Sequence, residues 1–499
     1  MFYTTLGFIV LLALTTVAYY LFPLRLRWWI LLTSSVVFYS FFGLYNAVCF
    51  SATILTTYLA ALLTDYLHKS RDNVLAGAGK DLQRDEKVKI KNKFRNLQRI
   101  CLSVCLLINI GFLAMVKLDG SLLMPMGLSF YTFRAVGYLI DVYRGKNKAE
   151  TNLPRFMLFC SFFPQIVLGP ISRYDELSQT LFTGNKLDIT NLSEGARRVL
   201  FGFFKKLVIA DRLLPVIREL VTENIHGADV IIVLIMYSVA LYCDFSGGID
   251  IALGTGRIFG VRLPENFNKP FLAVSITDFW QRWHITMGSW FRDYLFYPLS
   301  TAKPVRFISR WIQDKIGYNI GKRIPVYFIT LIVWSATGAW HGVSLSYVGW
   351  GLVNGIVIML SQMCETFYKR FHTRFPNAGK KRWYHAFTIV RTYLLMRVIS
   401  AFFVFENMGT SIRALLSIFT GPRLSSFRAL TELISASDLI VTGAGVALLI
   451  ILGLQKKDTY QRQRPLIRYA ALSLLLLIVL LFGVYGYGFD TEQFIYNRF

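Results

Sequence analysis

Charged residues are scarce in this chain, and the common motifs of soluble enzymes are missing. Only 17% of its 499 residues are Asp, Glu, Lys or Arg. The six cysteines form no Cys-x-x-Cys pair, so neither a zinc ribbon nor a disulfide framework is indicated. No His-Glu-x-x-His motif, no Gly-x-Ser-x-Gly motif and no cluster of Cys and His is found, so no metal site is predicted. These absences leave the apolar segments and a few isolated polar residues to carry the function.

Long apolar runs dominate the composition instead. Hydrophobic residues make up 54% of the chain, and ten segments approach the roughly 20 residues with which a helix spans hydrocarbon. These segments are 2–22, 28–43, 46–67, 100–117, 228–243, 325–345, 347–364, 386–404, 437–454 and 467–488. The sequence therefore predicts an all-α polytopic membrane protein with about 10–12 transmembrane helices. We expect one membrane domain over 1–499, with N-terminal helices in 1–145, a core in 150–345 and C-terminal helices in 346–499.

Two further absences refine this class. No basic residue precedes the first apolar core and no small-residue cleavage site follows it, so we expect a retained helix rather than a signal peptide. No internal repeat is visible, which argues against a transporter built from inverted repeats.

The formal charge of +25 arises from 54 basic and 29 acidic residues. The basic residues cluster in 69–99, 303–323, 369–382 and 456–468, each beside an apolar run, as the positive-inside rule predicts for cytoplasmic loops. The charge therefore indicates contact with anionic membrane lipids rather than with nucleic acid. The same loops predict that both termini lie outside.

The region 150–320 departs from the simple spanning pattern. Its segment LPRFMLFCSFFPQIVLGPIS is broken by prolines, and EGARRVLFGFFKKLVIADRLL is a basic amphipathic helix expected to lie in the membrane interface. Residues 264–300 mix Trp, Phe and Tyr with Asp, Arg and His, which is typical of re-entrant or interfacial helices. Irregular backbone at membrane depth needs protein or a water-filled cavity around it. We therefore expect a cavity open to the cytoplasm and lined by this segment.

Two histidines lie in apolar surroundings. His341 ends FITLIVWSATGAWH, and His284 lies in DFWQRWHITMGSWFRDY. A histidine exchanges protons near neutral pH, and burial keeps its ring neutral, as a general base requires. Plainer interpretations stay open, in which His341 is hydrogen-bonded near a helix end and His284 belongs to a charged interfacial helix. Two lone histidines would bind a metal only with carboxylate help.

Further polar residues flank these histidines in the sequence. Asp278 and Arg282 are four positions apart and can pair on one helix face, while the arginines could meet an anionic substrate. CDFSGGID ends an apolar run, but its glycines lack the context of a phosphate loop, so a close-packed helix break near the cavity is expected. The candidate substrate-binding residues are Asp250, Asn266, Arg282, Arg292, Asp293 and Trp340.

Several ordered motifs resemble those of a known family. WHITMGSWFRDYLFYPL followed by WSATGAWHG is similar to the paired signature of the membrane-bound O-acyltransferase family. DFSGGIDIALGTGRIFGVRLPENFNKPF, MGLSFYTFRAVGYLIDVYRG, FPQIVLGPISRY and the final FIYNRF extend the resemblance over the chain. It points to the bacterial branch with the alginate and peptidoglycan O-acetyltransferases and the teichoic-acid D-alanyl transfer protein. One departure is DFSGGID in place of DFSGYSD, which puts Gly248 where an aromatic residue often lies.

The resemblance implies a fold, a site and a reaction. The helices would surround a tunnel across a bacterial cytoplasmic membrane, with His341 as the family's catalytic histidine and His284 as the second histidine beside it. An acyl group, acetyl by expectation, would pass from a cytosolic thioester to a hydroxyl of a cell-surface polysaccharide or of an extracytoplasmic SGNH-type partner. The donor would be acetyl-coenzyme A or an acyl-phosphopantetheine carrier, with no permanently bound cofactor.

Three alternatives stay open. D-alanyl transfer to teichoic acid would draw on an aminoacylated carrier protein. A transporter or flippase would also need intramembrane histidines but would leave its cargo chemically unchanged. A structural membrane scaffold would be undisturbed by His341→Ala.

Overall fold

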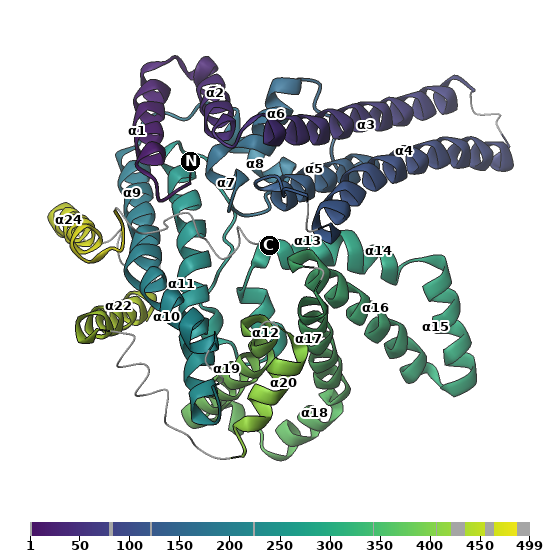
Figure 1. Ribbon diagram of the computed structural model, residues 1–499. Coiled ribbons are helices and arrows are strands. Elements are labelled where there is room, and N and C mark those ends of the chain that lie inside the picture. The colour runs from purple at the N-terminus through teal and green to yellow at the C-terminus, as the bar shows by residue number, and fades with distance from the viewer. Residues whose placement is uncertain are drawn as a thin grey trace. The chain divides into compact units, whose positions relative to one another are not determined.

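The computed structural model describes residues 2–78, 83–119, 122–222, 225–342, 344–405, 407–420, 435–454 and 464–486. These residues are mainly helical, with one isolated antiparallel bridge between Phe267 and Trp283 (Figure 1). The predicted all-α class is therefore confirmed. The chain divides into two compact units, Met1–Val199 with Ile251–Pro264 and Leu200–Asp250 with Glu265–Phe499. The predicted single membrane domain and its three-part division stay predictions.

The first unit is built on helix pairs. α1 (Leu6–Leu21) packs on α2 (Arg27–Ser40), and α3 (Leu44–Gly77) packs on α4 (Arg84–Leu118). The remaining helices are η1 (Leu24–Leu26), α5 (Leu128–Tyr143), α6 (Leu153–Ser161), α7 (Phe163–Ile166), α8 (Tyr174–Leu181) and the first part of α9 (Ile189–Phe203). Buried tyrosines tie distant segments together: the Tyr3 hydroxyl donates to the carbonyl of Pro164 at 3.0 Å, and that of Tyr19 to Phe259 at 3.1 Å.

The second unit holds the segments that carry the histidines. In chain order its elements are the π-helix η2 (Phe204–Ala210), α10 (Asp211–Thr222), α11 (Ala228–Ile258), η3 (Pro270–Leu272), α12 (Ile276–Arg282), α13 (Ile285–Phe291), the π-helix η4 (Arg292–Phe296), α14 (Tyr297–Ser300), α15 (Lys303–Ile316), α16 (Tyr318–His341), α17 (Leu345–Met363), α18 (Glu365–Arg374), η5 (Ala378–Lys380), α19 (Arg382–Val404), α20 (Met408–Ser417), α22 (Ala436–Leu454) and α24 (Pro465–Phe482). The end of α11, from Ile251 to Ile258, belongs to the first unit.

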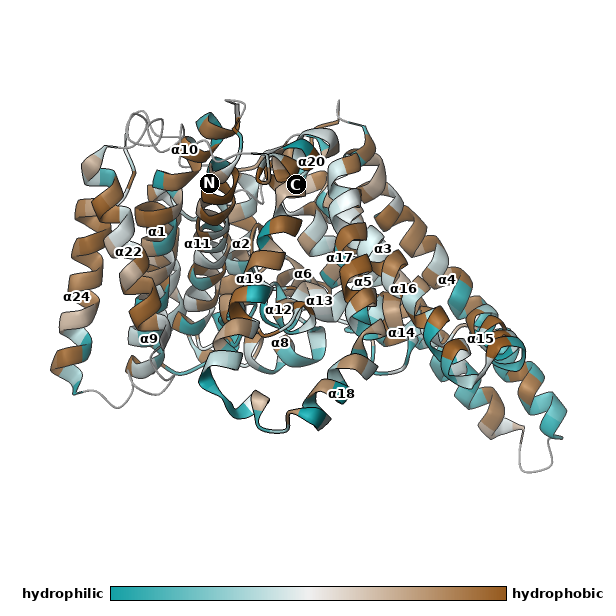
Figure 2. Ribbon diagram, turned by 90° about the horizontal axis from the view of Figure 1, so that it is seen from below, coloured by the Kyte–Doolittle hydropathy of each residue, from teal (hydrophilic) through white to brown (hydrophobic). Residues whose placement is uncertain are grey.

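Eight of the described helices are long and apolar enough to cross a membrane: α3, α4, α11, α16, α17, α19, α22 and α24. Hydrophobic residues cover most of the length of α22 and α24 in Figure 2. Only 11% of the apolar window of each of these two helices is buried, which fits helices that face lipid. The predicted multi-pass membrane protein is therefore confirmed. The predicted span 2–22 is a helix of 16 residues, and 28–43 forms α2 of 14 residues, which is not among the eight.

Glycines let α16 and α17 approach each other closely. A Cβ on Gly338 would lie 2.4 Å from the carbonyl oxygen of Tyr347, and one on Gly351 would lie 2.2 Å from that of Trp334. Small residues at such crossings allow the close backbone approach that packs helices in membranes. The close approach also brings Trp350 of α17 against Trp334 and His341 of α16, with ring centroids 6.2 and 5.2 Å apart.

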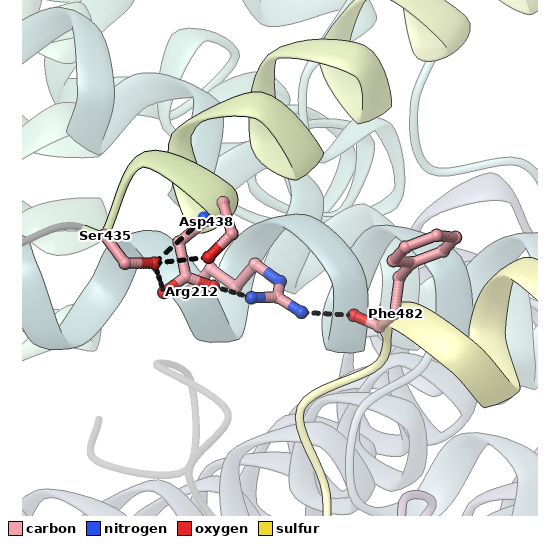
Figure 3. Close-up of polar contacts among 5 residues, drawn as sticks. Arg212, Ser435, Asp438 and Phe482 are labelled. Atoms are coloured by element: carbon pink, nitrogen blue, oxygen red, sulfur yellow. Dashed lines mark hydrogen bonds and ion pairs between the residues drawn. The ribbon is translucent and has the colours of Figure 1, made fainter.

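An arginine of α10 links the two lipid-facing C-terminal helices (Figure 3). Arg212 forms an ion pair with Asp438 at the start of α22, and its Nη2 donates to the carbonyl of Phe482 at the end of α24 at 2.7 Å. Ser435 caps α22 by accepting from the backbone N–H of Asp438 at 3.1 Å. These contacts attach α22 and α24 to the helix that follows the π-helix.

One interfacial element differs from its prediction. The lysines of EGARRVLFGFFKKLVIADRLL do not form an exposed basic face, because Lys205 and Lys206 are 4% and 1% exposed. The segment is also not one α-helix, since α9 passes into the π-helix and then α10. Residues 455–463 of the predicted basic loop, the motif FIYNRF and residues 421–434 lie outside the described residues. The orientation of the termini stays a prediction.

Candidate active site

Two cavities lie side by side in the second unit, and each contains one of the histidines. The His341 cavity, of about 50 Å³, is lined by Tyr237, Ser238, Leu241, Phe279, Trp280, Trp283, Met287, His341, Trp350, Met396, Arg397, Ser400 and Phe403. The His284 cavity, of about 350 Å³, includes Thr277, Gln281, Ser289, Arg292, Thr330, Trp334 and Thr337 in its lining. Trp280, Trp283 and Met287 line both cavities, so these three side chains form the wall between them.

That shared wall is held by hydrogen bonding and ring packing. The Trp280 indole N–H donates to the side-chain oxygen of Asn354 on α17 at 3.1 Å. Its ring packs edge-on against Trp334 and Trp350, with centroids 4.7 and 5.5 Å away. The indole of Trp280 is thus held both at its N–H and at its ring, which gives the wall a defined geometry between the cavities.

His341 is the last residue of α16 and is 3% exposed. Its ring lies among aromatic rings, with centroids 4.6 Å from Trp340, 5.2 Å from Trp350 and 5.2 Å from Phe403. Gly342 follows, and a Cβ there would lie 2.4 Å from the ring of Tyr347. The imidazole is thus a buried polar group with aromatic rings packed around it.

His284 lies at the junction of α12 and α13 and is fully buried. Its backbone is left-handed, with φ of 48°, which is costly for a residue other than glycine and is found most often at functional sites. The backbone N–H of Ile285 donates to the carbonyl of Asn266 at 3.0 Å, and Phe245 packs on the imidazole with centroids 4.8 Å apart. These contacts hold the strained turn.

Asn266 fixes the tautomer of His284. Its side-chain oxygen accepts from the backbone N–H of Thr286 at 3.0 Å and from the Thr286 hydroxyl at 2.9 Å, so the amide orientation is determined. The same oxygen lies 3.2 Å from Nδ1 of His284. Since a carbonyl oxygen only accepts, Nδ1 carries the proton and Nε2 the lone pair. Burial lowers the pKa of His284 to about 3, so the ring is neutral at physiological pH.

Trp340 bridges the two histidines. Its ring centroid is 5.9 Å from that of His284 and 4.6 Å from that of His341. Both imidazoles therefore pack on one indole, and each lines its own cavity. This arrangement suits a reaction whose two substrates enter from separate cavities and meet at the shared wall.

Asn266→Ala should reduce the activity of this site without unfolding the protein. The change removes the acceptor shared by His284 and Thr286. A lost buried hydrogen bond costs about 1–3 kcal/mol, and the same loss of transition-state stabilisation corresponds to roughly a 5- to 150-fold lower turnover. Asn266→Asp should instead raise the pKa of His284, because a carboxylate favours the imidazolium, and move the acidic limb of the pH–rate profile upward. The pH–rate profiles of purified variants measure both effects.

The neighbouring Asn268→Ala supplies the control, because that side chain is exposed. An unchanged pH profile in Asn266→Asp would contradict the assigned role of Asn266.

Among the remaining predicted site residues, one lines the His284 cavity, and several form ion pairs. Arg292 lines the His284 cavity and pairs with Asp293 at 2.9 Å. Arg282 pairs with Asp278 at 2.7 Å, as the spacing of four predicts. Asp250 does not line either cavity; it pairs with Lys205 at 2.5 Å.

A buried ion network lies behind His284 and was not predicted. Lys205 forms an ion pair with Asp250 and donates a hydrogen bond to the Ser246 hydroxyl at 3.1 Å. Lys206 forms ion pairs with Asp244 at 2.6 Å and with Asp211 at 2.7 Å. Phe245, the residue between Asp244 and Ser246, packs on the His284 ring. The partners are up to 45 positions apart, so no local spacing in the sequence signals the network.

The described residues hold no group of three or more His, Cys, Asp or Glu side chains that could bind a metal ion.

The sequence of the chain is similar to those of known membrane-bound acyltransferases. The sequence pattern of MBOAT, the membrane-bound O-acyltransferase family, matches residues 144–312, which include His284 and end before His341. A relative from Pseudomonas syringae pv. tomato, named "Probable alginate O-acetylase AlgI", is 32% identical over 336 residues, which are 66% of this chain and 57% of the relative. The chain spans 43% to 64% of the length of the five alginate relatives.

Two relatives carry other names. The Peptidoglycan O-acetyltransferase of Helicobacter pylori is 30% identical over 284 residues, which are 51% of this chain and 50% of the relative. The Teichoic acid D-alanyltransferase of Bacillus subtilis is 30% identical over 299 residues, which are 56% of this chain and 68% of the relative. The similarity therefore extends to proteins named for two different acyl groups.

Proposed function

Because the chain belongs to the membrane-bound O-acyltransferase family, we propose that it transfers an acyl group, acetyl in the first instance, from a thioester donor to a hydroxyl acceptor. The observation that carries this proposal is the pair of buried histidines, each lining its own cavity and both packed on Trp340. A two-substrate transfer needs two entrances that meet at a dry reaction centre. The acceptor would be a cell-surface polysaccharide or an extracytoplasmic SGNH-type partner.

The proposed reaction assigns His341 the role of general base. The acceptor hydroxyl attacks the thioester carbonyl while the neutral His341 ring takes its proton. The tetrahedral intermediate then collapses, the carbon–sulfur bond breaks, and the imidazolium returns the proton to the leaving thiolate. The aromatic rings around His341 exclude water, which limits hydrolysis of the thioester.

His284 would orient the donor. Its Nδ1 proton is directed to Asn266, so Nε2 can accept a hydrogen bond from an amide N–H of the donor. The larger His284 cavity would hold the donor, and Arg292 on its rim would meet the phosphates of coenzyme A or of a phosphopantetheine arm. In the predicted orientation this cavity opens to the cytoplasm of a bacterial cell, where thioesters are made, and both termini lie outside.

Arg292→Gln combined with Arg282→Gln should raise the donor KM. The side chain of Arg292 is 57% exposed and that of Arg282 is 31% exposed, so their attraction for phosphate is screened and the expected rise is about 2- to 5-fold. Initial rates at varied donor concentration measure it, with Arg310→Gln on exposed α15 as the control. An unchanged donor KM would contradict the assignment of these arginines.

The function itself is tested with labelled donors. Purified protein in proteoliposomes should move the label of acetyl-coenzyme A onto a hydroxyl acceptor in a covalent ester. D-alanyl transfer is the second candidate, because the chain covers 68% of a relative named for it. Labelled D-alanyl carrier protein in a parallel reaction decides between the two acyl groups. Passage of an unmodified cargo with neither label transferred would favour a transporter.

A further inference from the structure

Arg397 is a buried cation in the middle of a candidate membrane span. It lies on α19, is 7% exposed, and lines the His341 cavity. Among the described residues that line this cavity, Arg397 is the single Lys or Arg, and there is no Asp or Glu. The positive charge beside His341 is therefore not balanced within the cavity wall.

Aromatic rings hold the guanidinium in place. Its carbon lies 4.9 Å from the ring centroid of Tyr393 and 5.5 Å from that of Phe271. The Tyr393 hydroxyl lies 3.0 Å from that of Ser238, a second residue of the cavity wall. The rings orient the guanidinium but leave its donor groups available for hydrogen bonds.

The side chain also lacks a hydrogen-bonding partner in the described part of the chain. Its Nε is buried, and no described group accepts a hydrogen bond from it. No carboxylate among the described residues forms an ion pair with the guanidinium. Lys205 and Lys206, which are buried in the same unit, both pair with carboxylates. Burial of an unpaired charge is costly, and an arginine at membrane depth commonly marks a substrate path.

A guanidinium presents parallel N–H donors that match a carboxylate or a phosphate. We propose that Arg397 is the anion-binding residue of the His341 cavity and that the acceptor carries an oxyanion, a carboxylate or a phosphate, beside its reactive hydroxyl. The inference rests on the proposed function, since it places the acceptor in this cavity. It adds the chemical class of the acceptor to that function.

Matched acceptors test the proposal through activity. Methyl glucuronide is compared with methyl glucoside, and glycerol 3-phosphate with glycerol, so each pair differs by one anionic group. The wild type should prefer the anionic member of one pair, and the preferred pair identifies carboxylate or phosphate. Arg397→Gln should lower kcat/KM for that anion by about 10- to 100-fold more than for its neutral partner. Equal losses for both members would overturn the proposal.

Thermal stability tests the same residue without any turnover. In detergent, Arg397→Met should melt at a higher temperature than the wild type, because it removes an unbalanced buried charge. Methyl glucuronide or glycerol 3-phosphate should raise the melting temperature of the wild type and not that of the variant. Arg382→Met, at an exposed position near the start of the same helix, is the control. A lower melting temperature of Arg397→Met with an unchanged anion effect would overturn the proposal and indicate a structural residue.

The two measurements separate the two hypotheses. If no acceptor is acylated but the anion stabilises the wild type and not Arg397→Met, the proposed acyl transfer fails and the anion site stands. If acyl transfer proceeds with no preference for anions and no anion-dependent shift, the transferase stands and the anion site fails.

Discussion

His341→Ala should abolish acyl transfer while the protein stays folded. General acid–base catalysis contributes about 10²- to 10⁴-fold to a rate, and the alanine variant has no group left to take the hydroxyl proton. The imidazole is surrounded by Trp340, Trp350 and Phe403, and water entering the vacated space would not replace a positioned base. Release of free thiol from the donor, measured with and without acceptor, gives the rate.

Structure and activity must be separated in that experiment. The variant should elute as the wild type does on size exclusion in detergent and should melt within a few degrees of it. His372→Ala is the matched control, because His372 is exposed on α18 and lines neither of the two cavities. Wild-type transfer by His341→Ala would refute the base assignment, whereas His372→Ala is expected to be fully active.

Lys206→Met should destabilise the protein more than any substitution at the cavity walls. The lysine is 1% exposed and pairs with Asp244 and Asp211. Removal of one partner from a buried ion pair costs about 3–5 kcal/mol, because the carboxylates are left without a counter-charge. The melting temperature and the yield of folded protein in detergent should both fall, and Lys315→Met on exposed α15 should change neither.

The effect of Lys206→Met should grow with pH. Burial already raises the pKa of Asp211 to about 6 in the presence of the lysine, and without the lysine it rises further. A carboxyl whose folded pKa is raised contributes stability below its unfolded pKa of about 4 and loses it as pH rises through the folded value. The variant should therefore be nearest to the wild type at pH 5 and furthest from it at pH 8. A pH-independent difference would contradict the unpaired-carboxylate explanation.

The buried network also connects the π-helix to the residue that packs on His284. Asp244 and Ser246 are held by Lys206 and Lys205, and Phe245 between them packs on His284. Both lysines lie on the π-helix η2. A π-helix is rare overall, but where it occurs it is frequently at a functional site.

Triple replacement of Lys206, Asp211 and Asp244 by neutral residues should recover part of the stability lost in Lys206→Met, since an uncharged core has no charge to balance.

The sequence by itself determined the structural class of the protein and which two histidines are candidate site residues. Apolar runs of membrane length predicted most of the spanning helices, because a lipid-facing helix must satisfy its backbone internally and expose apolar side chains. His341 and His284 stood out for the same reason, since an ionisable residue in an apolar run is costly. Arg397 could have been found by that rule, since it and Arg391 are the two arginines of the apolar run 386–404.

Only the tertiary structure decided which polar groups meet. Asn266 lies 18 positions from His284, and the partners of Lys205 and Lys206 on α11 lie 38 to 45 positions away; no helical or strand period spans such distances. The amphipathic pattern of 194–214 predicted an interfacial helix because composition cannot reveal a distant carboxylate. The two cavities, their shared wall and the contact of Trp340 with both imidazoles likewise arise from packing between α12, α16, α17 and α19. Local sequence sets the cost of burying each group, and the fold alone supplies the partner that offsets it.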